Sequence, residues 1–168
     1  MGTQNLPFLA RYSGQTTGEL LALEGQFRTD SLILAFEAAL HQKFERSGAH
    51  SLSDEEKVLL AVEALEREVN NGGYHQFFLN TGCIFVPRIV ADLERLGADK
   101  AARITCEAIA LLNVEDGSEV DAYLRALDET EPERFSACDS AYQAEAGDLS
   151  ALLMSFIRKT ESRFNLTA

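Results

Sequence analysis

Apolar residues recur at helical spacing along this chain from Thr17 onward, and almost no stretch alternates apolar and polar residues as strands do. A first apolar stripe is followed by Gly48, and glycine ends helices well because it tolerates the left-handed backbone. The stripe consists of Leu32, Ile33, Phe36, Leu40 and Phe44. The pattern therefore predicts an all-α fold, with one helix that ends near residue 48.

A second helix is predicted from about residue 53 to about residue 70. It begins with Ser-Asp-Glu-Glu, a capping box in which the Ser53 hydroxyl and the Glu56 carboxylate each accept the other residue's backbone N–H. Its apolar stripe is Val58, Val62, Leu65 and Val69, and its opposite, solvent-facing side is predicted to carry Glu55, Glu63, Glu66 and Arg67. Two asparagines and two glycines, residues 70–73, then end the helix.

The remaining helices are shorter. A brief aromatic helix with Tyr74, Phe77 and Phe78 on one face is expected to close at residues 80–82. Further helices are predicted from Pro87 to Gly97, over residues 101–113, after a Ser118 cap, from Pro132, and from an Asp148 cap. The expectation is a single compact domain of about eight short to medium helices over residues 17–168, after a loosely ordered segment at residues 1–16.

The composition and the motifs of the sequence argue against several classes of function. The three cysteines are far apart and unpaired in sequence, and the three histidines lack metal-ligand spacing, so neither a disulfide framework nor a metal site is predicted. No phosphate-binding loop, dinucleotide motif or nucleophile elbow occurs, so we expect no cofactor and no catalytic residue, and not an enzyme. The N-terminus lacks a signal-peptide pattern and no apolar run would span a membrane, which indicates a cytoplasmic protein.

Charge is the unusual feature of the composition. The chain has 27 acidic and 15 basic residues, a formal net charge of −12, which argues against nucleic acid or an anionic membrane as a direct partner. Nine of these excess negative charges lie between residues 115 and 148, where only Arg125 and Arg134 are basic. The acidic residues there are Glu115, Asp116, Glu119, Asp121, Asp128, Glu129, Glu131, Glu133, Asp139, Glu145 and Asp148.

These carboxylates have two possible interpretations. Carboxylates one helical turn apart are separated by roughly 5–6 Å of rise, so neighbouring acidic helices would approximate a row of phosphates and attract a basic protein. The alternative is a solvated face that aids solubility, with several acids placed at helix starts where the dipole favours anions. The near absence of lysine and arginine favours an interaction surface, because an ordinary solvated helix mixes the two signs.

Residues 68–82, E-V-N-N-G-G-Y-H-Q-F-F-L-N-T-G, raise a separate question. His75 would serve as an acid or base beside asparagine and glutamine side chains that orient a substrate. No nucleophile or carboxylate is placed in sequence to complete such a site. The structural reading is that amides and glycines permit a sharp reversal, after which aromatic residues fill the groove between helices. We favour the structural reading and keep a small-molecule or catalytic site at this corner as the alternative.

The same segment, preceded by the helix from Ser53, resembles a bacterial family of small α-helical proteins catalogued around the C-terminal domain of a DNA-mimic protein. The resemblance is specific across residues 68–82 and extends over about residues 53–115. Its fingerprint, which we interpret as mainly structural, consists of Asn70, Asn71, Gly72, Gly73, Tyr74, Gln76, Phe77, Phe78, Asn80 and Gly82. The resemblance implies an all-α fold, often dimeric, and for the characterised member an acidic surface that occupies a DNA-binding protein in place of DNA.

The sequence therefore predicts a non-enzymatic acidic interaction protein. Its expected partner is a basic protein, such as a DNA-binding transcription regulator that it competes away from DNA. A third reading is a structural or immunity-type protein whose acidity is incidental.

Overall fold

A computed structural model describes residues 5–167, without the side chain of Thr81. The fold is all-α, as predicted: in the described residues there is no strand, and one isolated bridge joins Glu24 and Phe27. The elements are α1 (Thr17–Leu21), α2 (Thr29–Ser47), η2 (Ala49–Ser51), α3 (Asp54–Phe77), η3 (Phe78–Gly82), α4 (Cys83–Leu96), α5 (Asp99–Ala110), α6 (Val120–Asp128), η4 (Pro132–Phe135), α7 (Ser136–Glu145), α8 (Leu149–Lys159) and η5 (Glu161–Arg163).

The chain divides into two compact units, which are described separately. Unit 1 comprises Met1–Leu60 and Ser150–Ala168, and unit 2 comprises Ala61–Leu149. Residues 1–4 and 168, which the sequence analysis assigned to a loose N-terminus and to the helical domain, lie outside the described residues. The single domain over residues 17–168 stays a prediction.

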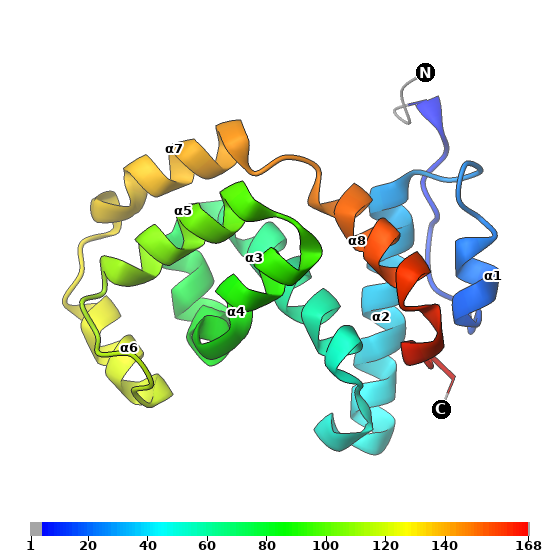
Figure 1. The fold of residues 1–168 in the computed structure, drawn as a ribbon, viewed down its shortest axis with the longest axis horizontal. Coiled ribbons are helices and arrows are strands. Elements are labelled where there is room, and N and C mark those ends of the chain that lie inside the picture. Colours follow the sequence, from blue (N-terminus) through cyan, green and yellow to red (C-terminus); the bar gives the residue numbers. More distant parts are fainter. Residues whose placement is uncertain (1–4, 168) are drawn as a thin grey trace. The chain divides into compact units, whose positions relative to one another are not determined.

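Unit 1 joins the two ends of the sequence. Figure 1 shows α8, coloured orange to red, beside α2, and α1 packs on α2 as well. The core contains Leu32, Ile33, Phe36 and Leu40 of the predicted α2 stripe, all fully buried, and Phe36 meets Phe164 edge-on at 6.2 Å. Phe44, predicted on the same stripe, is instead 46% exposed. The segment before α1 is tied to this core, because the Leu9 amide donates to the Ser31 hydroxyl at 3.0 Å.

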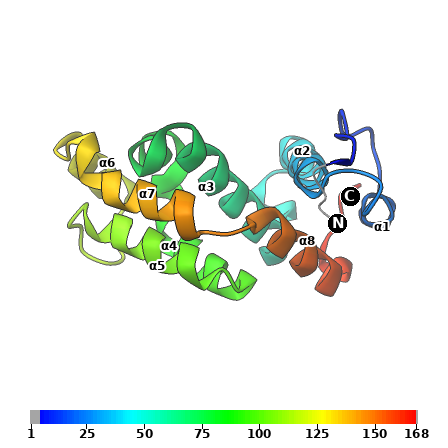
Figure 2. The same ribbon diagram turned by 90° about the horizontal axis from the view of Figure 1, so that it is seen from above.

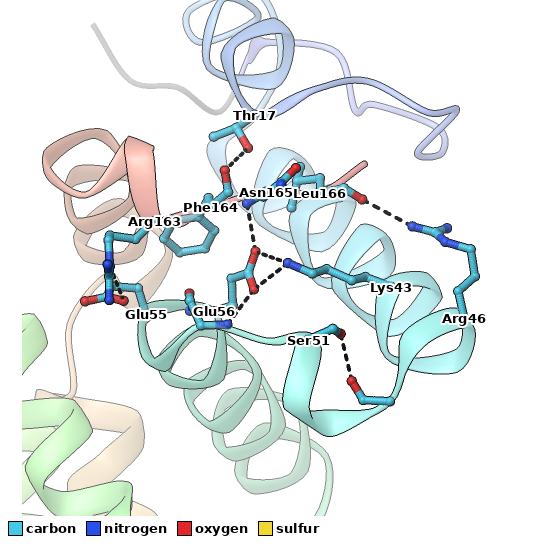
Figure 3. Close-up of polar contacts among 12 residues, drawn as sticks. Thr17, Lys43, Arg46, Ser51, Glu55, Glu56, Arg163, Phe164, Asn165 and Leu166 are labelled. Carbon is cyan, nitrogen blue, oxygen red and sulfur yellow. Dashed lines mark hydrogen bonds and ion pairs between the residues drawn. The ribbon is translucent and has the colours of Figure 1, made fainter. Parts of the chain in front are cut away.

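A buried ion pair fastens the C-terminal segment within unit 1. The predicted capping box is present: the Ser53 amide donates to Glu56 Oε2 at 2.8 Å, and the Glu56 amide donates to Ser53 Oγ at 3.1 Å. The fully buried Glu56 carboxylate also accepts both Lys43 Nζ, at 2.9 and 3.0 Å, and the Asn165 amide, at 2.8 Å (Figure 3). One carboxylate therefore starts α3, neutralises a lysine of α2 and holds the chain after η5.

Further contacts support this segment. Thr17 Oγ1 donates to the Phe164 carbonyl at 3.0 Å, and an Arg46 guanidinium nitrogen donates to the Leu166 carbonyl at 3.4 Å. Arg163 pairs with Glu55 at 3.3 Å (Figure 3). Glu55 is buried, so its predicted place on a solvent-facing side of α3 is wrong.

Unit 2 is built from the rest of α3, η3 and α4–α7. Figure 2 shows α5 and α7 running side by side, and α4 packs against both α5 and α6. Its core is aromatic: Tyr74 meets Phe77, Phe78 and Tyr142 at centroid distances of 5.8–6.5 Å, and Phe78 meets Phe135 at 5.6 Å. Cys138 and Tyr142 of α7 are buried in this core.

One predicted boundary is confirmed and two differ from the structure. The helix predicted to end at residues 70–73 does end there, because Gly72 and Gly73 leave helical geometry, and α3 as labelled joins two helices across this bend as far as Phe77. The π-helical η3 then leads directly into α4, so the helix predicted to start around Pro87 already begins at Cys83, and Pro87 is its fifth residue. Ser118 does not cap α6, whose N-cap residue is Glu119.

Candidate partner-binding surface

Eight of the eleven predicted acidic residues lie in α6 or in the segments directly before and after it. Four precede the helix or lie in its first turn, and four lie at its end and in η4. All eight are exposed, and none of them makes an ion pair with any residue that the structure describes. We call this set the α6 acidic surface; it consists of Glu115, Asp116, Glu119, Asp121, Asp128, Glu129, Glu131 and Glu133.

The dipole of α6 favours the acidic residues at its N-terminus and disfavours those at its C-terminus. Glu119 and Asp121 lie at the N-terminus, where an anion is stabilised by about 0.3–1 kcal/mol. Asp128 and Glu129 lie at the C-terminus, where the carbonyl groups repel an anion. Arg125, in the last turn of α6, forms no ion pair within residues 5–167. Local helix stability therefore accounts for the first pair of acids and not for the second.

The other three predicted acids are placed differently. Glu145, at the end of α7, pairs with Arg103 of α5 at 3.2 Å. Asp148 lies just before α8 and is engaged in an interaction of its own. Asp139 is half-buried, and its Oδ1 accepts the Tyr74 amide at 2.8 Å. Three of the eleven predicted acidic residues are thus engaged in contacts within the protein.

Asp139 caps the part of α3 that follows the glycine bend. Gly73 has φ 76° and ψ −176°, and a Cβ placed on it would lie 2.6–2.7 Å from the Asp139 carboxylate. This close approach brings the carboxylate to the first amide after the bend. Burial raises the pKa of Asp139, and the hydrogen bond from Tyr74 opposes that rise. Asp139, predicted as part of an acidic surface, thus has a capping role that its sequence position did not indicate.

The face of α7 that carries Asp139 also contacts the fingerprint corner, by which we mean residues 68–82, and the helical turn before it. Tyr142 Oη donates to Glu66 Oε2 at 2.9 Å, and Gln143 Nε2 donates to Asn70 Oδ1 at 2.8 Å. The Asn70 amide nitrogen is in turn bonded to Glu66. Glu66 is half-buried with its carboxylate bonded, whereas Glu63 is buried, so the predicted solvent-facing position is wrong for Glu63.

A second group of hydrogen bonds, within the fingerprint corner, joins α3 to η3. Glu68 Oε2 accepts Gln76 Nε2 at 2.9 Å and Asn80 Nδ2 at 2.7 Å. These two bonds, with a smaller contribution from Arg67, lower the pKa of Glu68. His75 is half-buried against Phe135, with ring centroids 6.2 Å apart. The side-chain amides of Asn70, Gln76 and Asn80 are bonded to other protein groups, which favours the structural interpretation of the corner.

The Glu68 contacts give a pH-dependent contribution to stability. Because its pKa is lower in the folded protein than its ordinary value of 4.5, the contribution is complete above that value and is lost as pH falls through the folded value. We expect the stability difference between the wild type and Glu68→Gln to be constant from about pH 7 down to about pH 5 and to shrink below it. Urea unfolding of both proteins across this range measures the difference. A difference that stays constant into acid would contradict the assignment.

The described residues contain no group of three or more histidine, cysteine, aspartate or glutamate side chains arranged to hold a metal ion. In the same part of the chain, no helix has the length and apolar character needed to cross a membrane. Burial raises the pKa of the Cys83 thiol to about 11 and raises that of Cys138, whereas Cys106 is exposed.

The comparisons with known proteins extend the sequence resemblance. A family model described as DMP19-like protein matches residues 50–160, well over half of the chain. The matched range includes all of unit 2, with the fingerprint corner and the α6 acidic surface. A comparison with curated proteins finds no match.

Proposed function

Because the chain belongs to the family of DMP19-like proteins, we propose that it is a non-enzymatic acidic protein that binds a basic DNA-binding protein and competes with DNA for it. DNA mimicry is the function associated with this family. The observation that carries the proposal for this chain is the α6 acidic surface, with eight exposed carboxylates and no ion pair among the described residues.

The position of Asp128 and Glu129 supports a binding role for this surface. They lie at the helix end where the dipole is unfavourable to anions, so they weaken α6 instead of stabilising it. Residues that break a local rule are often explained by function. A basic partner would reverse the penalty, because its guanidinium or ammonium groups satisfy the carboxylates and relieve their mutual repulsion.

The dimensions of α6 also suit the proposal. Its nine residues separate the two groups of acids by about 13 Å of helix rise. This length is close to the roughly 12 Å width of the DNA major groove, which separates two phosphate backbones. A protein whose basic side chains contact phosphates on both sides of that groove would meet two groups of carboxylates at a similar spacing.

Affinity capture with a charge-matched control tests the proposed function. Immobilised wild-type protein is expected to retain a basic DNA-binding protein at low salt, and both duplex DNA and rising salt should release it. The variant Asp128→Asn with Glu129→Gln should retain much less. The control, Glu45→Gln with Glu161→Gln, removes the same charge from exposed positions in unit 1 and should behave as the wild type.

Two outcomes would contradict the proposed function. Equal retention by the two double variants would show that net charge alone is responsible. A captured protein that duplex DNA does not displace would not be competing with DNA.

A further inference from the structure

A groove lies between α4 and α5, and none of its lining residues belongs to the α6 acidic surface. It lies wholly within unit 2 and has a volume of about 540 Å³, in the range of roughly 300–1,000 Å³ that binding pockets occupy. Along α5 it extends from Asp99 to Ala110. That span corresponds to about 16 Å, or three helical turns.

Small residues create the floor of the groove. Ala102, Cys106 and Ala110 recur every four residues of α5, and Val90 of α4 lies opposite them. Because residues four apart lie on one face of a helix, the short side chains leave a continuous channel along that face. A floor of this kind accepts the side chains of another helix, which insert between helical ridges.

Acidic residues form the rim. Glu94 of α4 and both Asp99 and Glu107 of α5 line the groove. The one basic lining residue, Arg103, is held by Glu107 at 2.8 Å and by Glu145 of α7 at 3.2 Å. The rim therefore presents a net negative charge around an apolar floor, which is complementary to a helix with apolar residues on one side and cations on its flanks.

We propose that this groove binds a cationic amphipathic helix of the basic partner. The inference rests on the proposed function in one respect, the basic character of the partner. Apolar side chains of the helix enter the channel over Cys106, while its lysine or arginine residues meet Glu94 and Asp99 on the rim. The α6 acidic surface supplies charge, and the groove supplies a salt-insensitive apolar contact that DNA itself does not offer.

The probe for this proposal is a synthetic helical peptide of about 18 residues, long enough to hold helical structure, with lysine and arginine on one face and alanine and leucine on the other. A scrambled peptide of the same composition, without an apolar face, is the control. Cys106 reports on occupancy, because it is exposed in the groove while Cys83 and Cys138 are buried. The amphipathic peptide should slow iodoacetamide alkylation of Cys106, and the scrambled peptide should not.

Substitutions at Cys106 then test the contact. Cys106→Trp fills the channel and should weaken peptide binding by about tenfold or more, as loss of a central interface contact does. Cys106→Ser leaves the channel open and should bind like the wild type. Circular dichroism shows whether both variants fold.

Three outcomes would overturn the groove proposal. The first is unchanged peptide affinity in Cys106→Trp, and the second is peptide binding without protection of Cys106. The third is concentration-dependent dimerisation of the wild type that Cys106→Trp abolishes, because the occupant would then be a second copy of the chain. Each leaves the proposed function standing, since that depends on Asp128 and Glu129 and on displacement by duplex DNA.

Discussion

Glu56→Gln should lower the free energy of unfolding by about 3–5 kcal/mol, the range seen when one member of a buried ion pair is removed. The substitution leaves the Lys43 ammonium group buried, with 3% of the residue exposed, and without a counter-charge. It also weakens the bond that holds the Asn165 amide. Urea unfolding of the two proteins measures the loss.

A double-mutant cycle on Lys43 and Glu56 separates the electrostatic interaction of the pair from the packing of the two side chains. Lys43→Met alone should cost less than Glu56→Gln, because the carboxylate keeps the Ser53 and Asn165 amides as donors. The double variant should recover part of the loss, since neither charge is then left alone. Glu24→Gln, which breaks the exposed pair with Arg158, should cost less than about 1 kcal/mol. If Glu56→Gln cost no more than Glu24→Gln, the buried pair would not hold unit 1 together.

Gly73→Ala should destabilise the protein by about 2–4 kcal/mol, for two separate reasons. A Cβ is strained at φ 76° and ψ −176°, a region that essentially only glycine occupies. The same Cβ would lie 2.6–2.7 Å from the Asp139 carboxylate and would push it away from the Tyr74 amide that it caps. Urea denaturation, followed by circular dichroism, measures the change.

Gly48→Ala is the matched control for the bend. Gly48 has φ 78° and ψ 173°, close to the values at Gly73, and a Cβ there would lie 3.3–3.4 Å from the exposed His50 ring, so mainly the backbone term remains. Combining Gly73→Ala with Asp139→Ala should cost less than the sum of the single losses, because the carboxylate that clashes is gone. If Gly73→Ala were no more harmful than Gly48→Ala, the contact with Asp139 would carry no energetic weight.

The features predicted correctly from the sequence are local ones. The Ser53–Glu56 capping box depends on residues three apart, and the α2 core stripe depends on helical spacing alone. The bend was placed correctly at the paired glycines for the same reason. The resemblance stated for residues 68–82 is confirmed by the family match.

The errors on α3 came from assuming a single buried side. Leu59, Ala61 and Ala64 are buried together with the predicted stripe, so this helix is enclosed almost all round between Glu55 and Leu65. The signal was present in the sequence as the nearly unbroken apolar run V-L-L-A-V from residue 58 to residue 62. Glu55 and Glu63 are therefore buried groups and not part of a solvent-facing side.

The parts of the candidate site that were missed depend on tertiary contacts. Nothing in the local sequence shows that Asp139 reaches Tyr74, 65 residues earlier, or that Arg103 is shared between Glu107 and Glu145. The spacing of Ala102, Cys106 and Ala110 was visible, but a row of small residues is equally typical of a closely packed interior. Only the packing of α4 beside α5 shows that the row lines an open groove.

The division of the sequence between the two units has a consequence for the order of folding. Unit 2 is one uninterrupted stretch, Ala61–Leu149, whereas unit 1 needs residues from both sides of it. Closing a loop of that length costs chain entropy that short-range contacts avoid, so we expect unit 2 to form first. During synthesis, the Glu56 carboxylate that pairs with Lys43 acquires its last donor only after Asn165 has left the ribosome. We therefore expect the N-terminal helices to stay incompletely packed, and open to chaperones and proteases, until then.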